Sequence, residues 1–213
     1  MAVIRERIAR GTSDPGSVTL VAVTKGFGPD AVRAALGAGL VVLGENYADE
    51  LVAKAAAVAD DEGTPPQWHF LGAIQRNKVP RLAPIVSCWQ SVGRIEEGRA
   101  IARRSPGARV LVQVDVAGIP GRGGVPAPEV AGLVAALVDE GLDVAGLMAV
   151  GMPGEPEAAR PGFRTVSRLA DSLGLEVRSM GMTDDLEVAL SEGSTMVRVG
   201  RALFGQRPAR KES

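Results

Sequence analysis

Residues that build disulfides and metal centres are scarce in this chain of 213 residues. Cys88 is the only cysteine, which excludes an internal disulfide and any cysteine-based metal cluster. His69 is the only histidine, which excludes a site with several histidine ligands. Aromatic residues make up 3% of the chain, so only functions that need few aromatic side chains remain. The composition therefore predicts a protein without a resident metal ion.

The chain has neither a large excess of one charge nor a long hydrophobic segment. Lys and Arg number 24, Asp and Glu 25, and the net charge is −1, so the chain lacks the basic excess of proteins that bind nucleic acid or anionic membranes. No apolar run approaches the ~18 residues of a membrane span. The opening MAVIRERIAR is too charged for a secretory signal. We expect a soluble, cytoplasmic protein that binds neither nucleic acid nor membranes.

Short β-branched runs alternate with longer Ala-, Leu- and Arg-rich segments along the whole chain. Strands are expected at residues 17–23, 41–44, 68–72, 85–91, 108–116, 142–150, 175–180 and 194–200. Such alternation requires a parallel sheet, and eight strand–helix units fit a closed (β/α)8 TIM barrel. The alternative, a doubly wound open sheet, needs a fuller glycine motif than the G-x-G of VTKGFGPD. We expect one domain over residues 1–213, with a flexible tail at 208–213.

Helices are expected between the strands, at residues 29–39, 45–60, 75–82, 94–105, 126–141, 157–174 and 183–193. Pro29 suits the first turn of its helix. Pro161 falls inside the helix expected at 157–174, where a proline is unfavourable. Asp184 and Asp185 are expected in the first turn of the last of these helices, where they complement the helix dipole.

Lys25 lies two residues after the first predicted strand, and the carboxyl ends of the strands carry the functional groups in such barrels. A partly desolvated amine has a lowered pKa. In its neutral form it can condense with an aldehyde to give a Schiff base. The alternative is an ordinary lysine that extends into water. From position alone this alternative is the more common case.

The turns after the seventh and eighth predicted strands read RSMGMTDD and VRVGRALFG. Loops at these positions often bind phosphate, because glycines allow close approach of backbone N–H groups and the following helix starts favour anions. Alternatively, both are ordinary turns in which Ser179 only bonds backbone. The first and eighth strands become neighbours when the barrel closes. An amine beside a phosphate cradle would suit an aldehyde-bearing phosphate ester such as pyridoxal 5′-phosphate (PLP).

Several long blocks of the sequence resemble the pyridoxal phosphate homeostasis protein family, single-domain relatives of the alanine racemase N-terminal barrel (PLP fold type III). The blocks are LVAVTKG, LGENYADEL, WHFLGAIQRNKV, GLMAVG, RSMGMTDDLEVAL and STMVRVGRALFGQR. They extend from the first predicted strand to beyond the eighth, nearly the entire chain. The resemblance implies a PLP-binding protein with this barrel fold.

The resemblance also implies roles for individual residues. Lys25 is expected to carry PLP as an internal aldimine, and Ser179 and Gly200 to bind its phosphate. Arg201 stands where the family usually has Thr, so its N–H can still serve while its guanidinium replaces the hydroxyl or points to solvent. Arg198 is expected near the pyridine nitrogen. Because an arginine stays charged and accepts no proton, it keeps that nitrogen unprotonated and restrains carbanion chemistry.

Three further residues are expected around the cofactor. Asn46 should line the ring or its 3-hydroxyl side. His69, on the third strand, should support the site from behind, although a lone histidine on a strand is more often a core residue. Met148 should contact the ring or pack in the core. For Arg198, the alternative is an ion pair with Asp184 or Glu45.

The tyrosine content bears on whether the protein is an enzyme or a carrier. A racemase of this class needs a second base, a tyrosine from a separate β domain, and the only tyrosine here is Tyr47. We therefore expect a monomeric PLP carrier that serves vitamin B6 homeostasis and supplies apo-enzymes, with no catalytic residue of its own. The alternatives are a slow amino-acid racemase or related PLP enzyme, and a Schiff-base aldolase without cofactor.

Overall fold

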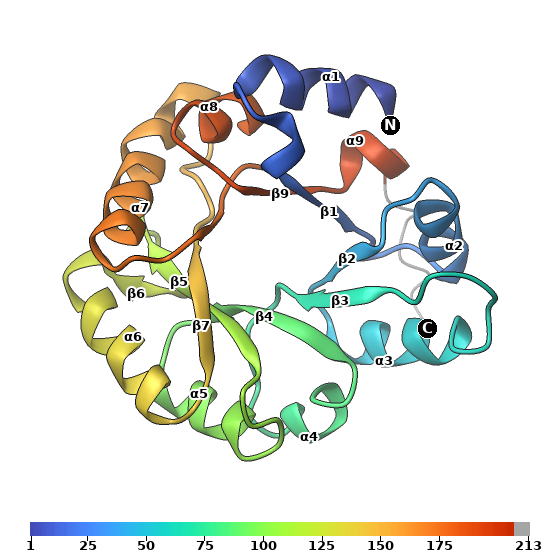
Figure 1. Cartoon of the computed structure of the whole chain (residues 1–213), viewed down its shortest axis with the longest axis horizontal. Coiled ribbons are helices and arrows are strands. Elements are labelled where there is room, and N and C mark those ends of the chain that lie inside the picture. Colours follow the sequence, from blue (N-terminus) through green and yellow to red (C-terminus); the bar gives the residue numbers. More distant parts are fainter. Residues whose placement is uncertain (207–213) are drawn as a thin grey trace.

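Eight parallel strands close into a barrel within residues 1–206, the part of the chain that this computed structural model describes (Figure 1). The barrel strands are β1 (Thr19–Val23), β2 (Val42–Glu45), β3 (Gln67–Phe70), β4 (Val86–Val92), β5 (Arg109–Asp115), β7 (Asp143–Met148), β8 (Val177–Ser179) and β9 (Met196–Val199). Each pairs with the next, and β9 pairs with β1 to complete the ring. The (β/α)8 prediction is confirmed and the open sheet is wrong. The tail expected at 208–213 lies outside the described residues.

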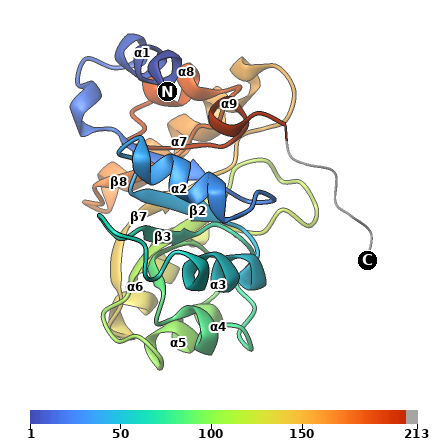
Figure 2. The same cartoon turned by 90° about the vertical axis from the view of Figure 1, so that its right-hand side faces the viewer.

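Helices surround the strands on the outside, as Figures 1 and 2 show. They are α1 (Ala2–Gly11), α2 (Pro29–Gly37), α3 (Ala48–Ala57), α4 (Val79–Leu82), α5 (Ile95–Ala102), α6 (Val130–Asp139), α7 (Arg160–Ser172), α8 (Leu186–Ser191) and α9 (Arg201–Phe204). A two-residue strand, β6 (Val125–Pro126), pairs with the end of β5 outside the ring. Among residues 1–206, no helix is long and apolar enough to cross a membrane.

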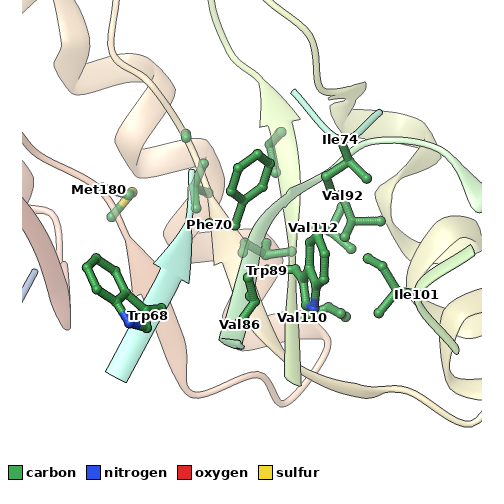
Figure 3. Close-up of a cluster of buried hydrophobic side chains, with 14 of the residues drawn as sticks. Trp68, Phe70, Ile74, Val86, Trp89, Val92, Ile101, Val110, Val112 and Met180 are labelled. Carbon is green, nitrogen blue, oxygen red and sulfur yellow. The ribbon is translucent and has the colours of Figure 1, made fainter. Parts of the chain in front are cut away.

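Side chains alternate between the two faces of the barrel strands, which gives the molecule two cores. The inner core holds one side chain from each of five strands: Val21, Cys88, Leu111, Met148 and Met196. The outer core, between strands and helices, is larger, and Figure 3 shows part of it. There the rings of Phe70 and Trp89 meet edge to face, with centroids 5.8 Å apart.

The structure differs from the sequence prediction at several helix starts. The helices expected from residues 75 and 126 begin at Val79 (α4) and Val130 (α6), in the second case because β6 and a 3-10 turn precede the helix. Helix α1, which lies beside α8 in Figure 1, was not expected. Its buried Ile4 and Ile8 pack with residues of α8. Pro161 lies in the first turn of α7 rather than its interior, because the preceding residues 156–159 form a separate 3-10 turn. Helix α8 begins at Leu186, so Asp184 and Asp185 precede it, and Asp185 accepts a hydrogen bond from the N–H of Met182.

Candidate functional site

The candidate residues lie at the carboxyl ends of adjacent strands. Lys25 is two residues beyond β1, Asn46 directly follows β2, and Gly200 directly follows β9. Because β1 pairs with β9, the segments after these two strands are neighbours. They approach so closely that a Cβ on Gly200 would lie 2.9 Å from the carbonyl oxygen of Val23. Only glycine allows this contact without a backbone shift.

Lys25 occupies the corner of a tight turn. The N–H of Phe27 donates to the carbonyl oxygen of Thr24 over 3.1 Å, which makes Lys25 and Gly26 the two central residues. Gly26 has a φ of +78°, the value that a type II turn requires at its third position. The sequence Lys-Gly therefore fits this turn, and Lys25 itself is partly buried.

A chain of polar side chains crosses the barrel interior below the strand ends. Arg198 donates to the hydroxyl oxygen of Ser179 over 2.7 Å, and that hydroxyl donates to Oε1 of Gln90 over 2.7 Å. Nε2 of Gln90 lies 2.7 Å from Nδ1 of His69 and also 3.2 Å from the sulfur of Met196. We call Arg198, Ser179, Gln90 and His69 the interior chain. The Gln90 amide donates to His69 if His69 carries its proton on Nε2, which leaves Nδ1 as the acceptor.

The two titratable ends of the interior chain have shifted pKa values. Burial lowers the pKa of His69 to about 4, with a smaller contribution from the charge of Arg109, so the ring is neutral at neutral pH. Burial also lowers the pKa of Arg198 to about 10, against an opposing effect of Asp185, and its guanidinium stays charged. The chain therefore carries one positive charge at one end.

The remaining hydrogen bonds of Arg198 go to backbone. Its Nη1 and Nη2 donate to the carbonyl oxygens of Ser179 and Ala149 over 2.6 and 2.7 Å. The alternative of an ion pair with Asp184 or Glu45 is wrong, because Asp184 pairs with Arg201 and Glu45 pairs with Lys54. Asp184 and Arg201 are both exposed at the surface, so the guanidinium of Arg201 points outward.

The other predicted residues occupy distinct positions. Asn46 is partly buried, and its Oδ1 is a buried atom with no hydrogen-bond partner among residues 1–206. Met148 is 2% exposed and packs in the inner core. His69 faces the barrel interior, because its neighbours Trp68 and Phe70 face the outer core (Figure 3). Tyr47 is 48% exposed.

Sequence reasoning missed Gln90, the central member of the interior chain. It contacts both His69 and Ser179, which are 21 and 89 residues away along the sequence. A signal was available: Gln90 is an amide within the apolar run IVSCWQS, and a polar group in a fully buried strand needs partners.

Two other kinds of site, a separate cavity and a metal centre, have less support. A cavity of about 940 Å³ is lined by residues such as Arg33, Val58 and Trp68, and none of the predicted site residues lines it. In the described part of the chain, no three His, Cys, Asp or Glu side chains gather where they could hold a metal ion. The strand ends above the interior chain therefore remain the candidate site.

Comparison with known proteins decides the family. Residues 4–208 match the protein family described as alanine racemase, N-terminal domain. A relative from Pseudomonas aeruginosa, named pyridoxal phosphate homeostasis protein, is 40% identical over 97% of this chain and 92% of its own length. The chain belongs to the pyridoxal phosphate homeostasis protein family. The resemblance predicted from the sequence blocks is confirmed.

Solved structures share the fold of this chain. PipY of Synechococcus elongatus, solved with PLP bound, is 28% identical, with a TM-score of 0.80 over 95% of this chain and all of PipY. An alanine racemase of Clostridium difficile shares the fold, with a TM-score of 0.73 at 14% identity. This chain matches 96% of its own length to that racemase but covers 58% of the racemase chain.

Proposed function

We propose that this protein binds pyridoxal 5′-phosphate at the carboxyl end of its barrel, holds it covalently through Lys25, and supplies it to PLP-dependent apo-enzymes. The observation that carries the proposal is the convergence of Lys25, Asn46 and Gly200 on adjacent strand ends, above the charged guanidinium of Arg198. The PLP-bound structure of PipY, similar over nearly the whole chain, supports it.

The proposed linkage is a Schiff base, which suits a lysine at a turn corner. The neutral Lys25 amine attacks the aldehyde carbon of PLP, a C=N bond replaces the C=O bond, and the oxygen leaves as water with the two amine protons. This step needs no oxidant or further reactant.

The side chains around Lys25 fit a flat ring that carries a hydroxyl and a basic nitrogen. The unpartnered Oδ1 of Asn46 needs a hydrogen-bond donor, and a ring hydroxyl supplies one. Arg198 offers only donors, so a ring nitrogen above it would stay unprotonated. An unprotonated ring is the weaker electron sink, which favours holding the cofactor over carbanion chemistry.

Phosphate would be bound at the ends of β8 and β9. Backbone N–H groups at Gly200 and Arg201 begin α9 and suit an anion. Ser179 is fully buried, and its hydroxyl donates to Gln90. Its proposed contact with phosphate therefore requires the hydroxyl proton to turn away from Gln90.

The proposal assigns no catalytic residue. Racemisation needs a second base near the substrate. His69 is neutral and bonded to Gln90, burial raises the pKa of the Cys88 thiol to about 12, and the only tyrosine of the sequence is exposed. These observations favour a carrier over the slow racemase.

The covalent site can be tested directly. Purified protein mixed with PLP should turn yellow, and borohydride reduction followed by peptide mass mapping should place the adduct on Lys25. Lys25→Ala should abolish the adduct, whereas the matched control Lys78→Ala, which removes an amine paired with Asp49, should retain it. An adduct elsewhere, or none, would overturn the proposal.

Carrier and racemase make different predictions in solution. The loaded protein should restore activity to a PLP-dependent apo-enzyme faster than an equal amount of the borohydride-reduced protein. Incubation with single L-amino acids should yield no sustained formation of D-amino acids. Sustained turnover would reject the carrier function in favour of the racemase.

A further inference from the structure

Both peptide units that flank Lys25 are held by side chains of one helix. Nζ of Lys54 donates to the carbonyl oxygen of Thr24 over 2.8 Å, and the N–H of Gly26 donates to Oε2 of Glu50 over 2.8 Å. That carbonyl and that N–H belong to the peptide units before and after the Cα of Lys25. Because peptide units are planar, fixing both restricts the backbone torsions of Lys25 itself.

Lys54 and Glu50 also contact each other, and Lys54 contacts strand β2. Lys54 and Glu50 are one turn apart on α3, with Nζ 3.3 Å from Oε2. Nζ of Lys54 also lies 2.6 Å from Oε1 of Glu45, the last residue of β2. The hydroxyl of Thr24 donates to the same Glu45 oxygen over 2.6 Å. Helix α3, strand β2 and the turn after β1 are thus joined at one point.

The ion pair between Lys54 and Glu45 is buried. Such a pair adds little net stability, because both charges lose their hydration. The side chains of Lys54 and Glu45 are 4% and 0% exposed, and burial raises the pKa of Glu45 against the effect of Lys54. Apolar residues of similar volume often serve stability as well as a buried ion pair does. Geometry at the neighbouring turn is what such a pair supplies and an apolar pair does not.

We propose that Glu45, Glu50 and Lys54, the Lys25 bracket, position the Lys25 amine for its reaction with PLP. The inference rests on the proposed function, because it concerns the same lysine. The bracket residues act on the backbone around Lys25 and are positioning residues. Misplacement of a reacting group by about 1 Å can cost on the order of 10²-fold in rate.

The test measures how fast the Lys25 adduct forms, by borohydride quenching at intervals after PLP is added and mass analysis of the peptide. Glu50→Ala removes the acceptor for the Gly26 N–H, and the rate should fall tenfold or more. Glu50→Gln keeps an acceptor oxygen and should retain most of the rate. Glu45→Gln combined with Lys54→Met removes the buried pair without leaving a lone charge, and the rate should fall similarly.

A control removes a surface ion pair between two helices that carry none of the site residues. Arg99 of α5 and Glu140, which follows α6, are 2.8 Å apart, and Arg99→Met with Glu140→Gln should leave the rate unchanged. Thermal melting checks that each variant is folded. Wild-type rates in folded Glu50→Ala and in the folded double variant would overturn the inference. If the double variant does not fold, Glu50→Ala against Glu50→Gln decides, because Glu50 is partly exposed.

Failure of the proposed function gives a different result. In that case the wild-type protein forms no reducible adduct on Lys25, and the variants have no rate to compare. If the wild-type protein forms the adduct and the variants form it at the same rate, the proposed function stands and the inference about the Lys25 bracket is wrong.

Discussion

Two buried cations near the barrel mouth have different hydrogen-bond and ion-pair partners. Lys54 lies in the layer between β2 and α3, 3% exposed, and is paired with the carboxylate of Glu45. Arg198 lies inside the barrel, 5% exposed, and its guanidinium donates to two carbonyl oxygens and one hydroxyl. The charge of Lys54 is balanced by a direct ion pair, whereas Arg198 is held by neutral dipoles and feels the carboxylate of Asp185 only through space.

The difference suggests different roles for the two cations. A charge paired with a carboxylate attracts a ligand only weakly, and Lys54 instead binds the backbone carbonyl of Thr24. A cation without a direct carboxylate partner still attracts electron-rich atoms above it, so under the proposed function we expect Arg198 to act on the ligand at the barrel mouth. Substitutions of the two cations should separate these roles, with the largest effect at Lys54.

Lys54→Met should be the most destabilising single change. It leaves the carboxylate of Glu45 buried without its cation, and breaking a buried pair in this way costs about 3–5 kcal/mol. Urea denaturation of the variant measures the free energy of unfolding. Adding Glu45→Gln should recover a large part of the loss. A loss below about 1 kcal/mol would mean that the pair is not buried as described.

The interior chain should make stability depend on pH through His69. Its pKa is about 4 in the folded state against an ordinary 6.5, so the unfolded chain binds the extra proton between these values. Stability is fully present above about pH 6.5 and falls by about 3 kcal/mol as pH drops through this window.

The matched comparison is His69→Gln, which cannot titrate. Denaturation of both proteins from pH 7.5 to 4 gives the difference, in which the contributions of the other groups cancel. Parallel pH profiles would contradict a neutral, buried His69.

Arg198→Met should cost less than Lys54→Met, because no carboxylate is directly paired with Arg198. Of its acceptors, the carbonyl oxygen of Ser179 still accepts from the N–H of Ala149, and the Ser179 hydroxyl still bonds Gln90. The carbonyl oxygen of Ala149 loses its donor, and a buried acceptor left unsatisfied costs about 1–3 kcal/mol. The same denaturation measurement applies. A loss that exceeds that of Lys54→Met would reverse the comparison between the two cations.

A surface ion pair gives the smallest expected effect. Asp184→Asn removes a carboxylate that pairs with Arg201, and both side chains are exposed at the protein surface. Exposed pairs of this kind contribute about 0.2–1 kcal/mol each and are screened by salt. Denaturation in low and high salt should show a small loss that shrinks with salt. A loss as large as that of Lys54→Met would contradict the distinction between buried and surface charge.

Much of the fold could be predicted from local patterns, because buried parallel strands read as continuous apolar runs and helices as the segments between them. Helix α1 escaped because its charges concealed the spacing of Ile4 and Ile8, one turn apart. The start of α7 was wrong because a proline reads the same in a helix interior as in a first turn until the preceding residues are seen.

The supporting residues of the site were harder to predict than the strand-end candidates. Lys54 sits in an Ala-rich helix and looks like a solvated lysine, and only its burial against Glu45 reveals its role. Gln90 meets Ser179 only after the barrel closes. Strand ends follow from local sequence, whereas contacts between distant strands and helices follow from the closed tertiary structure.

Closure of the ring by β9 against β1 has a consequence for biosynthesis. Lys25 is made early, but Arg198 and Gly200 belong to the last strand and the residue after it. A nascent chain still attached to the ribosome, with that strand inside the exit tunnel, has the amine but not its counterpart. Under the proposed function, PLP would therefore be bound covalently at this site only after the last strand has left the ribosome and closed the barrel.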